Sequence, residues 1–120
     1  RVGVLTADAA NLTPEHLRRA GGDAGRLTVC GLENEPFFRE AIFSGNGRLE
    51  VEKVSAEVVA QARRMVTADP AIRAVLLECS NLPPYAAAVQ EAVGLPVYDF
   101  VTMLHYARTA IARTPFISPE

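Results

Sequence analysis

The sequence contains no tryptophan and only two cysteines, Cys30 and Cys79. Two cysteines are too few for a disulfide scaffold, and neither lies in a CxxC or Cys/His spacing suited to zinc. The chain also lacks a Walker loop and a G-x-G-x-x-G loop, the usual cradles for nucleotide phosphates. Both cysteines are therefore interpreted as free thiols, and we expect no metal site.

Long hydrophobic runs and an excess of positive charge are missing as well. The sequence contains no stretch of about 18 apolar residues, the length needed to cross a membrane. Its N-terminus lacks the charged, apolar and small-residue zones of a secretory signal. The formal net charge is −2, and the charged residues, 22% of the chain, intersperse both signs. Such a chain has no basic patch for nucleic acid or an anionic membrane. We expect a cytoplasmic protein that binds neither.

What is present is an alternation of short apolar runs and amphipathic segments. The 120 residues are 49% hydrophobic, enough for one compact domain with a core. We expect residues 1–113 to form a single α/β domain and residues 114–120 a tail. The strands are predicted over residues 2–6, 27–32, 74–78 and 95–98, and the helices over residues 14–20, 36–43, 53–68, 84–93 and 100–112.

Two of these helices have clear sequence signals. Residues 53–68 carry an apolar stripe at helical spacing opposite polar side chains, the clearest helix of the chain. Asp99 is a plausible N-cap for the last helix. We expect this last helix to close the domain, with four apolar side chains turned inward: Phe100, Val101, Leu104 and Ile111.

Strands that alternate with helices imply right-handed crossovers, a parallel sheet and helices on both faces. The predicted fold class is an α/β, three-layer, flavodoxin-like sandwich with a four-stranded parallel sheet in the order 2-1-3-4. In this order the first and third strands are neighbours at the switch point. The loops after Thr6 and Cys79 would therefore line one crevice.

Cys79 is the main candidate for chemistry. It ends an apolar run, and Ser80, Asn81 and a proline pair follow it before an amphipathic segment, so the pattern indicates a strand that turns into a helix. The free N–H groups of a helix N-terminus would favour the thiolate and would bind a carboxylate beside Ser80 and Asn81. Alternatively, Cys79 is a small buried hydrophobe and Ser80 or Asn81 merely caps the helix.

The other polar residues near this turn have weaker claims. Thr6 and Asp8 end the first strand and could share the crevice, or they could form loop hydrogen bonds. Glu78 should point to the opposite face of its strand from Cys79 and is interpreted as structural. Cys30 is expected to pack in the interior, about 10 Å from Cys79 across two inter-strand spacings.

A family resemblance rests on three segments. The residues ECSNLPPY (78–85) and the following AVQEAVGLPVYDFVTMLHYA (88–107) resemble the C-terminal half of the aspartate/glutamate (Asp/Glu/hydantoin) racemase superfamily, and GVLTADAANLTPEHL (3–17) is similar to the start of that half. The resemblance implies two similar α/β domains that face each other across a cleft. One cysteine from each domain would invert a stereocentre next to a carboxylate, without cofactor or metal.

In this family Cys79 would be one catalytic acid/base, and Ser80 and Asn81 would bind the substrate carboxylate or assist the thiol. Glutamate racemases commonly have histidine where Asn81 stands. Because only one half is recognised, we expect a fragment, a separate domain or a single-domain relative. The chain alone would be inactive, and activity on an amino acid or related carboxylate would need the missing N-terminal domain or a homo-oligomer.

Two other functions remain open from the residues. A decarboxylase or cis–trans isomerase of the same superfamily would use a single cysteine, so that Cys79 alone could suffice. From a different class, the chain could be a non-catalytic ligand-binding or oligomerisation module in which Cys79 is inert.

Overall fold

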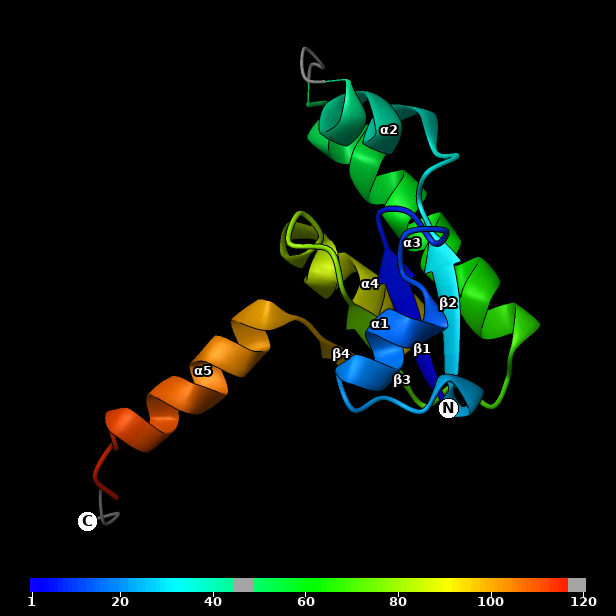
Figure 1. The fold of residues 1–120 in the computed structure, drawn as a ribbon. Helices are drawn as coiled ribbons and strands as arrows, with labels where there is room; N and C mark the ends of the chain where they lie inside the picture. The colour runs from blue at the N-terminus through cyan, green and yellow to red at the C-terminus, as the bar shows by residue number, and fades with distance from the viewer. Residues whose placement is uncertain (45–48, 117–120) are drawn as a thin grey trace.

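The computed structural model describes residues 1–44 and 49–116, which form a parallel sheet flanked by helices (Figure 1). Short 3-10 turns at Ala24–Arg26 and Pro83–Tyr85 precede β2 and α4. In chain order the strands and α-helices are β1 (Val2–Thr6), α1 (Pro14–Arg19), β2 (Leu27–Gly31), α2 (Pro36–Phe43), α3 (Val51–Ala68), β3 (Ala74–Leu77), α4 (Ala86–Val93), β4 (Val97–Tyr98) and α5 (Phe100–Ile111).

The sheet has four strands, all parallel, in the order β2-β1-β3-β4. Leu5 of β1 pairs with Cys30 of β2 on one side and with Leu77 of β3 on the other. The N–H of Glu78 donates to the carbonyl of Leu5 at 2.8 Å, so the β1–β3 ladder continues one residue past β3. The predicted flavodoxin-like fold class and strand order are confirmed.

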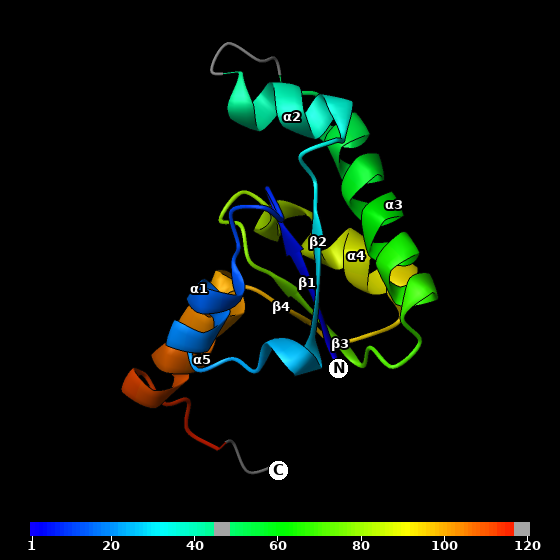
Figure 2. The same ribbon diagram turned by 45° about the vertical axis from the view of Figure 1, so that its right-hand side comes forward.

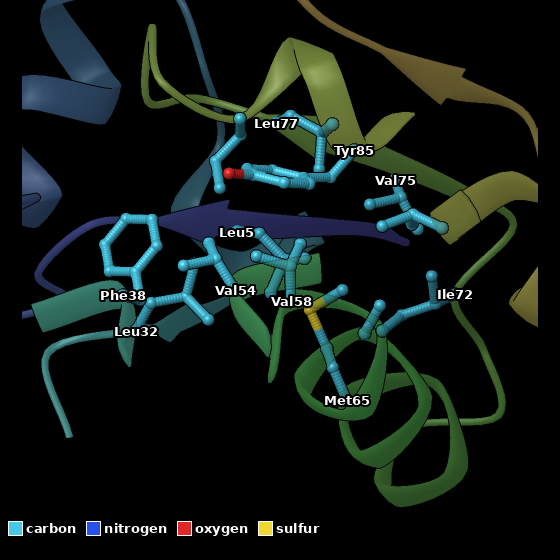
Figure 3. Packing of buried hydrophobic residues seen from close by; sticks show 13 residues of the cluster. Leu5, Leu32, Phe38, Val54, Val58, Met65, Ile72, Val75, Leu77 and Tyr85 are labelled. Atoms are coloured by element: carbon cyan, nitrogen blue, oxygen red, sulfur yellow. The ribbon is translucent and has the colours of Figure 1, made fainter. Parts of the chain in front are cut away.

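Helices lie on both sides of the sheet. Figure 2 shows α3 and α4 on one side and α1 with α5 on the other. The main core lies between the sheet and the first pair, where Leu5, Val75 and Leu77 of the strands meet the apolar stripe of α3 (Figure 3). The buried residues of that stripe are Val54, Val58, Ala62 and Met65, as the sequence pattern predicts.

Helix α2 receives its N-terminal cap from another helix. Its own N-cap residue, Glu35, makes no side-chain capping bond. Instead, the N–H groups of Phe37 and Phe38 donate to the carboxylate of Glu57 on α3, at 3.0 and 2.8 Å. Because the first N–H groups of a helix have no partner within it, Glu57 fixes α2 against α3 and helps to bury Phe38.

Several predicted boundaries differ from the structure by one or two residues, and proline accounts for two of them. The helix expected from residue 84 begins with the 3-10 turn Pro83–Tyr85, and α4 starts only at Ala86. The strand expected over residues 95–98 is shorter, Val97–Tyr98. Pro96 accepts a hydrogen bond from Val75 at 2.8 Å but has no N–H to donate in return.

The inward orientation predicted for the last helix was also wrong. No residue of α5 is buried, and Ile111 is 86% exposed. Asp99 and Thr102 form a capping box at its start, with the Thr102 N–H 2.8 Å from the Asp99 carboxylate. This cap starts the helix directly after β4, and Figure 1 shows α5 extending away from the sheet.

Two further sequence predictions fall partly outside the described residues. Ser44 ends α2, but residues 45–48, the remainder of its predicted stop, are not described, nor are residues 117–120 of the predicted tail. Across residues 1–44 and 49–116, no helix combines the length and the apolar character needed to cross a membrane.

The amino end of the sheet contains an acid-sensitive contact. The Thr28 hydroxyl donates to the Asp69 carboxylate at 2.6 Å, and the Arg1 guanidinium lies 2.8 Å from the same oxygen. The Thr28 hydrogen bond is the main cause that lowers the pKa of Asp69, helped by the Ala71 N–H and the Arg1 charge against a smaller opposing effect of burial. This contact therefore stabilises the folded chain above the ordinary carboxyl pKa, and the stabilisation is lost as the pH falls through the lowered pKa of Asp69.

We expect Asp69→Asn to flatten this pH dependence. Between about pH 5 and pH 2 the melting temperature of the unmodified chain should fall more steeply than that of the variant. Circular-dichroism melts across this range would measure both slopes. Glu91→Gln, at an exposed position of α4, is the matched control and should keep the slope of the unmodified chain. Parallel curves for all three proteins would contradict the assignment.

Candidate functional site

The candidate site lies at the carboxyl ends of β1 and β3, which are neighbours in the sheet. Cys79 follows β3 by two residues and is partly buried, with its side chain against the hydrophobic core. In an open α/β sheet, ligands bind in the crevice outside the carboxyl ends of the strands, at the switch point. The thiol is therefore where a parallel α/β domain places its ligands.

The turn after β3 brings Cys79, Ser80 and Asn81 together. The side-chain amide of Asn81 donates to the Cys79 sulfur at 3.7 Å, and the carbonyl of Cys79 accepts from the Leu82 N–H at 3.0 Å. Ser80 and Asn81 are exposed. The Asn81 amide is thus a polar group in direct contact with the sulfur.

The structure changes the predicted surroundings of the Cys79 thiol. Because α4 begins only at Ala86, Cys79 does not lie at the N-terminus of an α-helix, and the predicted effect of a helix dipole on the thiol was wrong. Carboxylate-binding donors remain in the turn. The backbone N–H groups of Ser80 and Asn81 donate to no other residue in the described part of the chain.

Thr6 and Asp8 are occupied by other contacts. Thr6 is buried, and its hydroxyl donates to the Glu78 carboxylate at 2.8 Å, on the side of the sheet away from the main core. Asp8 accepts from the Ala10 N–H at 2.9 Å and from the Asn11 amide at 2.8 Å, which closes its own loop. The structure thus joins Thr6 to Glu78, and among the described residues no hydrogen bond joins Thr6 or Asp8 to the thiol. Their role in substrate binding stays a prediction.

Cys30 lies in β2, with β1 between it and the strand that leads to Cys79. It is partly buried against the hydrophobic core, as expected. Burial is the main cause that raises the pKa of the Cys30 thiol, and the nearby Glu33 carboxylate raises it further against the opposing charge of Arg64. Cys30 therefore stays protonated at neutral pH and is poorly suited to act as a base.

Two features near the site had no sequence signal. Gly31 ends β2 so close to the loop after β1 that a Cβ there would lie 2.6 Å from the Ala9 nitrogen and would collide with the Glu33 carboxylate. A second feature is a hollow of about 550 Å³ between the β3–β4 face and α5. Sequence reasoning missed it because it expected α5 to fill that space.

We expect Asn81→Asp to slow alkylation of Cys79 by iodoacetamide roughly tenfold at neutral pH, because two charges about 4 Å apart interact by about 1 to 4 kcal/mol near a surface. The variant replaces a donor to sulfur with a negative charge. Mass spectrometry of the peptide that contains Cys79 would give the rate. Gln90→Glu, the same change at an exposed position of α4, should leave the rate unchanged. Equal rates for both variants would show that Asn81 does not act on the thiol.

The fold and the site together define an open parallel α/β domain with a free thiol at the carboxyl edge of its sheet. The chain is 34% identical to dimethylsulfoniopropionate lyase 5 of Emiliania huxleyi (strain CCMP1516) over 120 aligned residues. The alignment covers 93% of this chain and 23% of that protein. It is 33% identical over 124 aligned residues to dimethylsulfoniopropionate lyase 7 of the same strain, and this alignment covers 95% of this chain and 36% of that protein.

A dimethylsulfoniopropionate lyase of Durusdinium sp. clade D is 33% identical over 106 residues, which cover 84% of this chain and 35% of that protein. The chain thus spans about a quarter to a third of the length of these curated relatives. No family model and no solved structure matches the chain.

These names correct the identification made from the sequence. The relatives, similar over most of the chain, are named lyases and not aspartate or glutamate racemases. Assignment to the racemase superfamily, and with it the function as an amino-acid racemase or isomerase, was therefore wrong. The alternatives within that superfamily, a decarboxylase or a cis–trans isomerase, find no support in the names either.

Proposed function

We propose that this chain is the thiol-bearing domain of a lyase that cleaves dimethylsulfoniopropionate, with Cys79 as the base. The observation that supports the proposal is similarity at 33–34% identity, over 84–95% of the chain, to relatives named for this activity. The thiol at the carboxyl edge of the sheet supplies a group suited to the chemistry.

The substrate itself indicates the reaction. Dimethylsulfoniopropionate has a carboxylate, a C–H bond next to it, and a positively charged dimethylsulfonium group on the following carbon. If the Cys79 thiolate removes the proton next to the carboxylate, the electron pair of that C–H bond forms the C=C bond and the C–S bond breaks. The products are acrylate and dimethyl sulfide, and the thiol returns its proton to solvent. This elimination needs one base, whereas inversion of a stereocentre needs acid/base groups on two sides.

The turn after β3 would supply the other contacts to the carboxylate end of the substrate. The free N–H groups of Ser80 and Asn81 can bind a carboxylate, and the Asn81 amide lies 3.7 Å from the sulfur. Beneath the turn, the hydrogen bond from Thr6 to Glu78 ties β1 to β3 and keeps the turn in place.

In our proposal, residues outside this chain make the remaining contacts to the substrate. The chain spans about a quarter to a third of its curated relatives, so the rest of a longer polypeptide, or a second copy, would cover the sulfonium end of the substrate. The cytoplasmic location remains a prediction from the sequence.

The proposal is tested by incubating the chain, and a polypeptide of the relatives' length that contains it, with dimethylsulfoniopropionate. Gas chromatography of the headspace measures dimethyl sulfide, and proton NMR of the solution measures acrylate. We expect the two products in equal amounts, at a rate proportional to protein concentration. Failure of both polypeptides to release dimethyl sulfide above the buffer blank would overturn the proposal.

A further inference from the structure

Helix α5 exposes large apolar side chains along its whole length. Phe100 and Leu104 are about half exposed, and Met103, Tyr106 and Ile111 are more exposed still. A helix that is apolar on most of its surface is buried in the functional state of a protein. Helix α5 therefore lacks the surface that would cover it among the residues that the structure describes.

The sheet beside α5 is uncovered in the same way. Leu76 of β3 and Tyr98 of β4 point to the face opposite the main core and are exposed. Between this face and α5 lies the hollow of about 550 Å³, whose walls include Leu76, Tyr98, Met103 and Tyr106. Both faces of a parallel sheet are normally covered, whereas this part of the face is open to solvent among the residues that the structure describes.

The molecule is more extended than a compact domain of the same length. The radius of gyration is 16.2 Å and the longest extent 54 Å. A compact domain of this length has a radius of gyration of about 14 Å. Figure 1 shows that α5 is the element that extends the molecule.

The charges of the two surfaces are complementary. Helix α5 carries Arg108 and His105 and has no acidic residue. The charged groups in the walls of the hollow are Glu78 and Asp99, both acidic. Asp99 is occupied by the helix cap, whereas Glu78 is exposed and has a hydrogen bond only to one of its oxygens from Thr6.

The exposed area is close to what a stable dimer needs. At roughly 200 Å² for each large side chain, the exposed fractions of Tyr98 and the five α5 side chains named above correspond to roughly 760 Å² per copy. A standard interface buries about 800 Å² per partner. Because α5 and the hollow belong to the same chain, a contact with two-fold symmetry would place α5 of each copy against the hollow of the other.

We propose that two copies of this chain dimerise by placing α5 of each copy in the hollow between the β3–β4 face and α5 of the other. Arg108 of each copy then lies near Glu78 of the other copy, and Tyr106 and Leu104 fill the hollow. The contact is isologous, so it closes as a dimer and does not continue into a filament. This inference does not depend on the lyase function.

Sedimentation velocity of the whole chain tests the proposal, over concentrations from about 1 to about 500 μM that bracket micromolar affinity. We expect one reversible monomer–dimer equilibrium. Leu104→Glu should weaken it at least about a hundredfold, because it buries two unpaired charges per dimer. Val51→Glu is the matched control, since Val51 and Leu104 are both 54% exposed and Val51 lies on α3. It should leave the equilibrium unchanged.

A charge-reversal pair distinguishes the proposed arrangement from other dimers. Arg108→Glu and Glu78→Arg should each weaken self-association roughly tenfold, because each places like charges opposite each other at two points. An equimolar mixture of the two variants should dimerise as the unmodified chain does, since both contacts again join opposite charges. Circular-dichroism melts would confirm that each variant is folded.

Three results would overturn the proposal. The first is a chain that stays monomeric throughout the concentration range, which would leave the surface to another partner. The second is growth into open-ended oligomers. The third is a dimer that Leu104→Glu leaves intact or that the mixed charge variants fail to restore.

Discussion

Replacing Cys79 by serine is expected to lower kcat/KM for dimethylsulfoniopropionate by a factor of about 10² to 10⁴, the usual contribution of a positioned general base. A serine hydroxyl preserves the size and the polar contacts of the side chain. It is not ionised near neutral pH, so it cannot remove the proton next to the substrate carboxylate. The assay is the release of dimethyl sulfide by a polypeptide that contains this chain.

Cys30→Ala is the control for the loss of a thiol elsewhere in the sheet. The raised pKa of Cys30 and its position beyond β1 keep it away from the reaction, so this variant should retain activity within about threefold, as expected for a residue with no transition-state contact. If Cys79→Ser kept full activity, the base would have to be another residue. If Cys30→Ala lost as much activity as Cys79→Ser while its melting temperature stayed unchanged, the assignment of roles would be reversed.

The second large effect is expected from Phe38→Ala, which should lower the free energy of unfolding by about 3 to 5 kcal/mol. Phe38 is fully buried between α2, α3 and the end of β2, beside Leu32 and Val54 (Figure 3). Its removal would leave a cavity in a close-packed core and would loosen the helix that Glu57 caps. Urea unfolding, followed by circular dichroism, gives the free energy.

Phe43→Ala provides a matched comparison in the same helix. Phe43 is 49% exposed, and its ring lies edge-on to that of Phe38, with centroids 6.3 Å apart. The loss of one such aromatic pair is worth about 0.5 to 1.5 kcal/mol, so the effect should be small. Similar losses for the two variants would contradict the packing described for Phe38.

The mistaken racemase identification has a chemical explanation. A racemase and the proposed lyase would both use a cysteine to remove a proton next to a carboxylate, and both would need donors for that carboxylate. The residues Cys79, Ser80 and Asn81 meet these needs in either case. What distinguishes the two reactions is a second acid/base group or a leaving group on the next carbon, and neither can be deduced from this turn.

The sequence was sufficient for the architecture because its signals are local and repeated. Apolar runs, the stripe of α3 and Gly94, which ends α4 in the left-handed conformation, each follow from short-range sterics or burial. Since parallel strands joined by helices obey one handedness, a parallel sheet with Cys79 at its carboxyl edge could be predicted as well, whereas the order 2-1-3-4 was assumed from the flavodoxin-like fold and is the order that the structure has.

Only the tertiary structure decided which side chains meet. Thr6 points to Glu78 rather than to the thiol, and Asn81 is the residue that donates to the Cys79 sulfur. The apolar pattern of α5 predicted side chains turned into this domain, and the structure leaves them exposed, because such a pattern does not specify the surface against which a helix packs. The helix starts at the Asp99 cap and extends away from the sheet (Figure 1), and the hollow in which we place a second copy lies between the two.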